Sequence, residues 1–117
     1  MSGVRLRSDI WVSAYMRRCR IEGAFAYLRR RGAEEAGAIF IKLDALDGSV
    51  RLFGPAPQYA VEDRGADRLF IELPLKGDIP ALAAEEKLQR EISFDPDLWV
   101  VEVEDRAGRH FLNVVEV

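Results

Sequence analysis

The hydrophobic positions near the start of the chain repeat with the period of an α-helix. Those that share one helical face are Trp11, Val12, Tyr15, Met16 and Cys19. Spacings of three and four residues place side chains on the same side of a helix. Ser8 and Asp9 precede this stripe, and both residue types favour the first turn of a helix. Gly23 is a typical stop, so the pattern predicts a helix over about residues 9–22.

Most of the remaining apolar residues fall in short runs that are typical of β-strands. The predicted strands cover residues 24–31, 37–43, 49–53, 69–73, 98–104 and 110–117. The first run is also compatible with a short helix. We favour a strand, because the interval between Gly23 and Gly32 has a length that is usual for strands and marginal for helices. Asp47-Gly48 signals a hairpin turn, and residues 105–108 predict a final hairpin.

A second helix is predicted after the fourth strand. Pro80 fits its first turn, where a missing N–H leaves no hydrogen bond unmade, and Phe94-Asp95-Pro96 ends the pattern. The residues of its predicted inner face are Ala81, Ala84, Leu88 and Ile92. The predicted order of elements is therefore α-β-β-β-β-α-β-β.

Several predicted strands are apolar on consecutive positions rather than on alternate ones. The clearest cases are Ile39-Phe40-Ile41 and Leu98-Trp99-Val100-Val101. Strands of this kind are usually covered on both faces. The pattern thus predicts an α/β (α+β) fold with a mainly antiparallel sheet of about six strands and two helices, arranged in three α/β/α layers. The alternative is a two-layer fold whose second sheet face is buried in a homodimer.

Composition places the chain among ordinary globular proteins. It has 117 residues, of which 49% are hydrophobic and 32% charged, and this suits a single domain over residues 1–117. Cys19 is the sole cysteine, which excludes an internal disulfide and a cysteine-rich metal site. No apolar run is long enough to span a bilayer, and no secretory signal is visible. We therefore expect a cytoplasmic protein that uses no membrane and no cofactor.

Few residues are suited to catalysis. The only histidine, His110, stands in a predicted strand and is expected to be a structural or surface residue. Cys19 lies on the apolar stripe of the first helix and is expected to be a buried, inert thiol. The acidic pairs are Glu34-Glu35, Glu85-Glu86 and Asp95 with Asp97. We expect these pairs in a turn, on an exposed helix face and at a helix end. Glycosidase-type chemistry needs two carboxylates across a pocket, so the sequence does not predict an enzyme.

The basic residues are distributed unevenly. Residues 1–31 hold eight arginines and have a net charge of +6, whereas residues 32–117 have a net charge of −9. The candidate binding surface consists of Arg5, Arg7, Arg17, Arg18, Arg29 and Arg31. The first two precede a predicted helix N-terminus, which favours anions. The opposite interpretation is a solvated face whose arginines form weak ion pairs with the acidic remainder of the chain.

Five segments, in order along the whole chain, form a recognisable set. They are Arg5-Leu-Arg-Ser-Asp-Ile-Trp-Val-Ser-Ala-Tyr-Met-Arg-Arg18, Gly37-Ala-Ile-Phe-Ile-Lys-Leu43, Asp47-Gly48, Phe53-Gly-Pro-Ala-Pro-Gln58 and Phe94-Asp-Pro-Asp-Leu-Trp-Val-Val-Glu-Val-Glu-Asp105. The set resembles domain-of-unknown-function family 1491, whose members are short bacterial proteins found chiefly in alphaproteobacteria. The resemblance implies a small cytoplasmic domain with no assigned activity, cofactor or catalytic residue, and it assigns no functional residues.

These observations predict a non-enzymatic protein-interaction or adaptor module, whose partner is another protein or a second copy of the chain. Its surface is the arginine-rich N-terminal part, helped by the irregular stretch 54–68, which presents Gln58 and Tyr59. The alternative is binding of phosphate, another anion or nucleic acid, and the residues for it are Arg5, Arg7, Arg17 and Arg18. An isoelectric point near 5.2 argues against nucleic acid.

Overall fold

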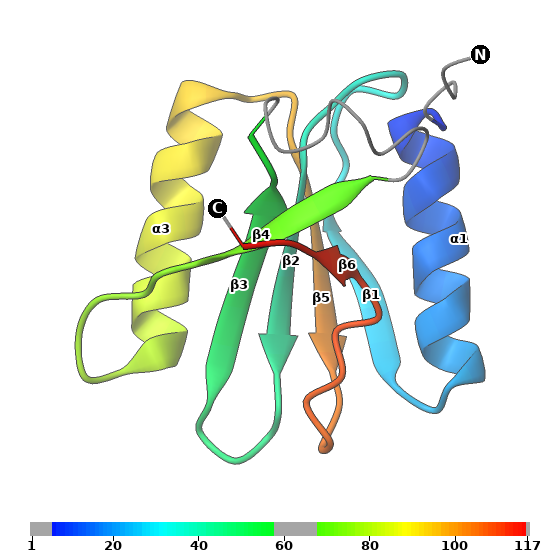
Figure 1. Cartoon of the computed structure of the whole chain (residues 1–117). Coiled ribbons are helices and arrows are strands. Elements are labelled where there is room, and N and C mark those ends of the chain that lie inside the picture. Colours follow the sequence, from blue (N-terminus) through cyan, green and yellow to red (C-terminus); the bar gives the residue numbers. More distant parts are fainter. Residues whose placement is uncertain (1–5, 58–67, 117) are drawn as a thin grey trace.

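The computed structural model describes residues 6–57 and 68–116. In these ranges the chain forms two helices and six strands in the predicted order (Figure 1). The elements are α1 (Ser8–Ile21), β1 (Phe25–Arg30), β2 (Ile39–Asp44), β3 (Val50–Pro55), β4 (Leu69–Leu73), α3 (Pro80–Phe94), β5 (Trp99–Glu104) and β6 (Asn113–Val114). The run after Gly23 is thus a strand. Neither of the two described helices is long and apolar enough to cross a membrane.

The strands form one mixed sheet in the order β1-β5-β2-β3-β4-β6. The pairs β1/β5, β2/β3 and β3/β4 are antiparallel, as predicted for most of the sheet. The pairs β2/β5 and β4/β6 are parallel, which corrects the expectation in detail. The fold class is α+β.

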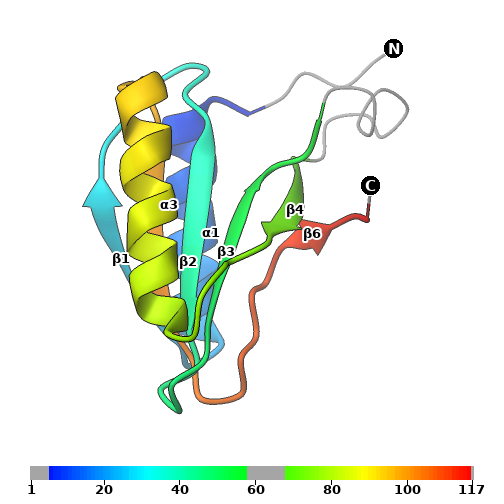
Figure 2. The same cartoon turned by 90° about the vertical axis from the view of Figure 1, so that its left-hand side faces the viewer.

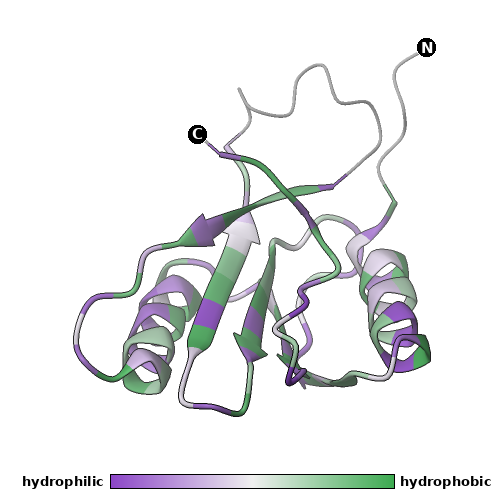
Figure 3. Cartoon of the chain, turned by 60° about the horizontal axis from the view of Figure 1, so that its bottom comes forward, coloured by the Kyte–Doolittle hydropathy of each residue, from purple (hydrophilic) through white to green (hydrophobic). Residues whose placement is uncertain are grey.

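The two helices cover opposite faces of the sheet, so the molecule has the three predicted layers (Figure 2). Side chains alternate between faces along a strand. The consecutive apolar residues of β2 and β5 therefore serve both layers. On the α1 face the buried residues from these strands are Ile39, Ile41, Leu43, Trp99, Val101 and Val103. On the α3 face they are Phe40 and Val100, which pack with Leu88. Both helices mix hydrophobic and hydrophilic positions, as expected of outer layers (Figure 3).

The start of α1 differs from the prediction. Ser8 is its first residue and does not cap it, because the Ser8 hydroxyl donates to the carbonyl oxygen of Gly37 at 2.7 Å. The backbone N–H groups of Ser8 and Asp9 donate instead to the carbonyl oxygens of Glu35 and Glu34, at 3.2 and 3.0 Å. A distant segment of the chain therefore satisfies the first N–H groups of the helix.

The other helix signals are confirmed, with one correction. Gly23, with a φ of +92°, follows the last turn of α1, and Pro80 is the first residue of α3. The buried residues of α3 are Ala83, Ala84 and Leu88. Ala81 was predicted to face inward but is exposed.

The predicted final hairpin is wrong. β5 pairs with β1 on one side and with β2 on the other, so neither of its edges is free for residues 110–117. The C-terminal segment crosses the sheet instead, and β6 pairs in parallel with β4. Asp105 accepts hydrogen bonds from the Arg109 backbone and side chain at 2.8 and 2.9 Å, and Phe111 has a φ of +57°. An extended return strand cannot contain that φ.

β3 ends two residues later than predicted. Gly54 and Pro55 continue the strand and pair with Ile71 and Phe70 of β4. Proline lacks only its own N–H, which is tolerated at the last position of a strand. The predicted irregular stretch 54–68 therefore begins later, and Gln58 and Tyr59 lie outside the described residues.

Candidate functional site

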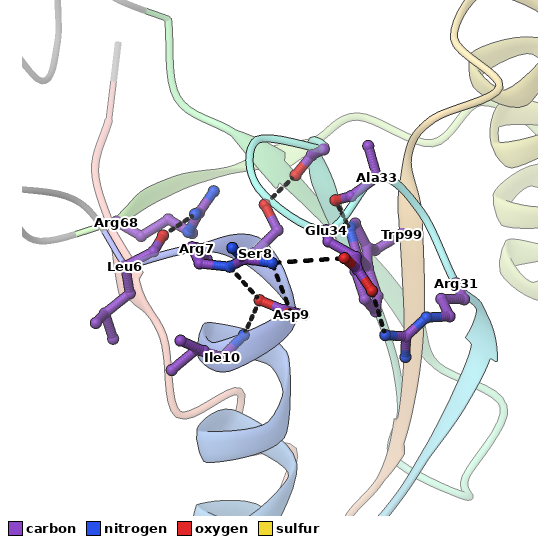
Figure 4. A network of polar contacts seen from close by, with 11 residues as sticks. Leu6, Arg7, Ser8, Asp9, Ile10, Arg31, Ala33, Glu34, Arg68 and Trp99 are labelled. Atoms are coloured by element: carbon purple, nitrogen blue, oxygen red, sulfur yellow. Dashed lines mark hydrogen bonds and ion pairs between the residues drawn. The ribbon is translucent and has the colours of Figure 1, made fainter.

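Two of the candidate arginines form internal contacts at the start of α1 (Figure 4). Arg7 Nε lies 3.3 Å from Asp9 Oδ1, and Arg7 Nη2 lies 3.5 Å from Glu34 Oε1. Arg31 Nη2 lies 3.5 Å from Glu34 Oε2. The hydrogen bond from Arg7 lowers the pKa of Asp9. The N-terminus of α1 is thus already supplied with acceptors from the same chain. Arg5 lies outside the described residues.

A third candidate, Arg29, lies on the opposite face of the sheet, beneath α3. Its Nη1 and Nη2 atoms each lie 2.6 Å from a carboxylate oxygen of Glu85, and Nη1 lies 3.0 Å from Glu102 Oε2. Lys42 Nζ lies 3.0 Å from Glu85 Oε2. We call Arg29, Lys42, Glu85 and Glu102 the α3 ion-pair cluster. Its two positive and two negative charges balance, so it joins the helix to the sheet and leaves no excess charge for a ligand.

The α3 ion-pair cluster corrects the expectation for Glu85, which is half-buried rather than part of an exposed acidic pair. The Arg29 hydrogen bonds lower the pKa of Glu85 to about 2. This carboxylate is therefore ionised at neutral pH and suits a structural pair, not a general acid. Within residues 6–57 and 68–116, no three histidine, cysteine, aspartate or glutamate side chains converge on a possible metal site.

The last two candidates, Arg17 and Arg18, are exposed on α1 and have different surroundings. Arg18 lines a pocket of about 290 Å³ between α1 and the segment that precedes β6, whereas Arg17 does not. We call this cavity the α1 pocket. Its aromatic and polar lining residues are Trp11, Tyr15, Phe111, Arg18, Arg68 and Asn113. In the described structure, this pocket brings Arg18 of the candidate binding surface next to an apolar cavity.

The aromatic wall of the α1 pocket is held by ring contacts and by a hydrogen bond. The rings of Trp11 and Tyr15 stack with centroids 4.9 Å apart and planes 12° apart, and Trp11 also packs against Phe70 at 5.3 Å. The Tyr15 hydroxyl donates to the carbonyl oxygen of His110 at 2.7 Å, and burial raises the pKa of this phenol. Tyr15 therefore ties α1 to the C-terminal segment and stays neutral.

Two guanidinium groups border this wall. The Cζ atom of Arg68 lies 5.9 Å from the Trp11 ring centroid, and that of Arg18 lies 5.9 Å from the Phe111 ring centroid. Arg68 also donates to the carbonyl oxygen of Leu6 at 3.0 Å. None of the described lining residues is acidic, and no described carboxylate lies within 4 Å of the Arg18 guanidinium. The α1 pocket thus has an aromatic wall inside and the exposed Arg18 guanidinium at its border.

The segment beside the α1 pocket has an unusual backbone. Phe111 adopts a positive φ, which is rare for a bulky residue and is often found at functional sites. The Leu112 N–H donates to His110 Nδ1 at 3.0 Å. Burial lowers the pKa of His110, whose ring also packs 5.1 Å from Phe53. These contacts hold the Phe111 ring in its place at the pocket.

Sequence reasoning found only part of this site. Arg18 was a candidate, but Trp11 and Tyr15 were assigned only to the apolar stripe of the helix. Trp11 is in fact only partly buried. The spacing of Trp11, Tyr15 and Arg18 along α1 is a usable signal, because residues three, four and seven positions apart share a helix face. No local sequence pattern could assign Arg68 and Phe111 to this pocket, because only the sheet topology brings them close to α1.

Cys19 is expected to be unreactive in the folded protein. Its side chain is fully buried, and burial raises the pKa of the thiol. A disulfide reagent such as dithiobis(nitrobenzoate) should label no thiol in native protein and one per chain in guanidinium. Labelling of native protein at the rate of the unfolded chain would contradict this burial.

Comparison with known proteins identifies relatives of the whole fold. The family described as "Protein of unknown function (DUF1491)" matches residues 6–113. The crystal structure of a DUF1491 family protein from Caulobacter crescentus is similar, with a TM-score of 0.78, 37% identity, and coverage of 97% of this chain and 100% of that chain. An NMR structure from the same organism gives the same TM-score and coverage with 38% identity.

A solution structure of a protein from A. tumefaciens also matches, with a TM-score of 0.78 and 42% identity. The match covers 97% of this chain and 98% of that chain. No curated protein matches the sequence.

Proposed function

The chain belongs to the DUF1491 family, whose function is unknown, and from its own surface we propose that it is a cytoplasmic protein-interaction module. The α1 pocket binds an apolar anchor residue of a partner protein, and an acidic residue that flanks this anchor contacts Arg18. The observation that carries the proposal is an aromatic cavity bordered by the exposed Arg18, without a carboxylate among its described lining residues.

The size of the α1 pocket favours a protein partner over a free ligand. Its volume of about 290 Å³ lies at the lower limit of the roughly 300–1,000 Å³ that is usual for small-molecule sites. A cavity of this size suits a single side chain. Aromatic pockets that receive one anchoring side chain are typical centres of protein–protein interfaces. The stacked rings of Trp11 and Tyr15 supply such a wall.

The charges around the α1 pocket favour an acidic partner. Arg18 is exposed at the border of the α1 pocket, and residues 1–31, which include α1, have a net charge of +6. Complementary charges speed association and select between partners. Bidentate contacts from arginine to a carboxylate are also among the strongest polar contacts in proteins.

Binding of a free anion is the alternative function, and the structure supports it less. Of the three expected residues that the structure describes (Arg7, Arg17 and Arg18), only Arg18 lines the α1 pocket, and Arg7 pairs with Asp9 and Glu34. A phosphate ion also gains no favourable apolar contact from the aromatic wall of the α1 pocket. We therefore include free anions as one arm of the test.

The test is a titration followed by the NMR signal of the Trp11 indole N–H. The main probe is a synthetic peptide with one phenylalanine between pairs of glutamates. Its matched counterpart carries lysines in place of the glutamates, and phenylacetate and inorganic phosphate represent free anions. The Trp99 indole N–H donates to the Ala33 carbonyl at 2.8 Å inside the fold and serves as the internal reference.

We expect the acidic peptide to shift the Trp11 signal and the lysine peptide to leave it unchanged. Arg18→Gln should weaken the acidic peptide about tenfold, because it removes one charge-assisted contact. Arg17→Gln is the matched control and should bind like wild type. Equal binding of both peptides, or no Trp11 shift at all, would refute the proposal. Phenylacetate or phosphate binding as tightly as the peptide would make the free anion the ligand.

A further inference from the structure

The side chain of His110 holds the backbone across Phe111. Its Nδ1 atom accepts a hydrogen bond from the Leu112 N–H at 3.0 Å, while the His110 carbonyl oxygen accepts one from the neutral Tyr15 hydroxyl at 2.7 Å. Phe111 stands between these two bonded groups in the chain and has a φ of +57°. A bulky residue keeps such a conformation only where its surroundings hold it. We propose that protonation of His110 releases Phe111 from the wall of the α1 pocket.

The hydrogen bond to Leu112 exists only while the His110 ring is neutral. An Nδ1 atom that accepts an N–H carries no proton, so the neutral ring holds its proton on Nε2. Protonation places a second proton on Nδ1, and two donors then face each other. The Leu112 N–H loses its acceptor. His110 is only partly buried, so solvent supplies the proton.

The released residues belong to the α1 pocket itself. Phe111 and Leu112 both line it, and the Cζ atom of Arg18 lies 5.9 Å from the Phe111 ring centroid. Without the bond to Leu112, Phe111 relaxes to the negative φ that bulky residues prefer, and this change turns its ring away from Arg18. The pocket therefore keeps its shape while His110 is neutral and loses it when the ring is charged.

The charged groups around His110 determine where it titrates. Arg51 of β3 and Glu72 of β4 face the ring and pair with each other at 2.9 Å. Arg109 precedes His110 in the chain and pairs with Asp105 at 2.8 Å. Burial and the Arg51 charge lower the pKa of His110, and the Glu72 charge, which raises this pKa, offsets only part of the effect. The net pKa lies below the ordinary value of 6.5.

The lowered pKa fixes the direction of the effect. The unfolded chain takes up the proton first, so the neutral ring stabilises the fold above pH 6.5, and this contribution is lost as the pH falls through the lower pKa of folded His110. The pocket wall is thus in place at neutral pH and is released by acid. The consequence for partner binding rests on the proposed function, whereas the release of Phe111 is measured on the free protein.

The test is an NMR titration of the full chain from about pH 8 to about pH 5, the range in which histidine changes charge. The ring signals of His110, the only histidine, give the midpoint of its protonation. At that midpoint the Leu112 amide should lose its protection from hydrogen exchange, and the nuclear Overhauser contact between the Phe111 ring and the Arg18 side chain should disappear. Arg51→Gln removes a repelling charge and should raise all of these midpoints together.

His110→Asn is the matched control, because an asparagine side chain accepts the N–H two residues further on but does not titrate. This variant should keep the Leu112 protection and the Phe111 contact over the whole pH range. The proposal is overturned if His110 of the wild type is protonated while both observables persist. It is equally overturned if His110→Asn shows the same transition. Thermal unfolding at the upper pH should confirm that the variants are folded, and the wild-type titration decides the proposal by itself.

The acidic peptide of the functional test separates this inference from the proposed function. The wild type should lose affinity for the peptide below the His110 midpoint, and His110→Asn should keep it. Equal affinity of the wild type on both sides of the midpoint would count against the release of the pocket wall. A peptide that binds at no pH refutes the proposed function alone, because the titration of the free protein still decides whether Phe111 is released.

Discussion

Gly37→Ala is expected to lower the free energy of unfolding by about 3 kcal/mol and the melting temperature by about 10 °C. A Cβ at position 37 would lie 2.5 Å from the Asp97 carbonyl oxygen, 2.8 Å from Trp99 Nε1 and 2.9 Å from the Ala33 carbonyl oxygen. None of these three atoms belongs to a flexible side-chain end. The added methyl group therefore has no space into which it can push its neighbours.

The atoms around Gly37 also hold one another in place. The Ala33 N–H donates to the Asp97 carbonyl, and Trp99 Nε1 donates to the Ala33 carbonyl, both at 2.8 Å. Displacing either carbonyl breaks one of these hydrogen bonds in addition to the steric cost. Trp99 is one of the largest fully buried side chains, so the disturbance reaches the core.

The measurement for Gly37→Ala is urea unfolding followed by tryptophan fluorescence. Ala36→Ser is a suitable control, because it alters the neighbouring, exposed residue and should change stability by less than about 0.5 kcal/mol. If Gly37→Ala is as stable as this control, the atoms around Trp99 leave enough space for a methyl group at position 37, which contradicts the prediction.

Glu85→Gln is expected to cost about 2 kcal/mol of stability at neutral pH. Glu85 receives two Arg29 hydrogen bonds at 2.6 Å and one from Lys42 at 3.0 Å. The amide keeps the shape of the side chain but loses the charge that these donors contact. The Glu85 side chain is 37% exposed, so solvent screens part of the interaction. We therefore expect a smaller loss of stability than the pKa shift of Glu85 alone would imply.

The stabilisation from Glu85 should depend on pH in a defined window. The folded state lowers the pKa of Glu85 from 4.5 to about 2, so the unfolded chain binds the proton first. This contribution is fully present above pH 4.5 and is lost as the pH falls towards 2. The stability difference between wild type and Glu85→Gln should therefore shrink over this interval. A difference that stays constant down to pH 2 would contradict the role of the Glu85 charge.

The exposed pair between Arg51 and Glu72 provides the matched control. It has similar bidentate geometry, with Arg51 donating at 3.1 and 2.9 Å, but both side chains are more than two-fifths exposed. Exposed ion pairs contribute about 0–1 kcal/mol. Glu72→Gln should consequently cost less than half of what Glu85→Gln costs. Equal costs would show that burial beneath α3 adds nothing to the cluster.

Local patterns predicted the elements of this fold well. The apolar stripe of α1, the stop at Gly23 and the first-turn proline of α3 are properties of short segments, and the structure confirms them. The consecutive apolar residues of β2 and β5 correctly predicted two covered faces. These signals arise because backbone propensity and side-chain burial act over a few neighbouring residues.

Contacts between distant segments were harder to predict. The serine cap of α1 was wrong because the Gly37 carbonyl takes the Ser8 hydroxyl. The final hairpin was wrong because β5 has two other partners. The α1 pocket shows the same limit, since Arg68 and Phe111 reach α1 only through the position of β4 and β6. Charge counting alone could not show that Arg7 and Arg29 are held in pairs within the chain.

The central position of β5 has a consequence for how the protein is made. A ribosome releases the N-terminal segments first, and α1 and β1 emerge long before β5 is synthesised. β1 pairs only with β5 among the described strands, so it waits without a partner until β5 has been synthesised. The hairpins β2/β3 and β3/β4 can close earlier, because their strands are adjacent in sequence. Completion of the sheet should therefore be slow and should wait for the synthesis of β5, and until then the nascent chain leaves β1 without its partner strand.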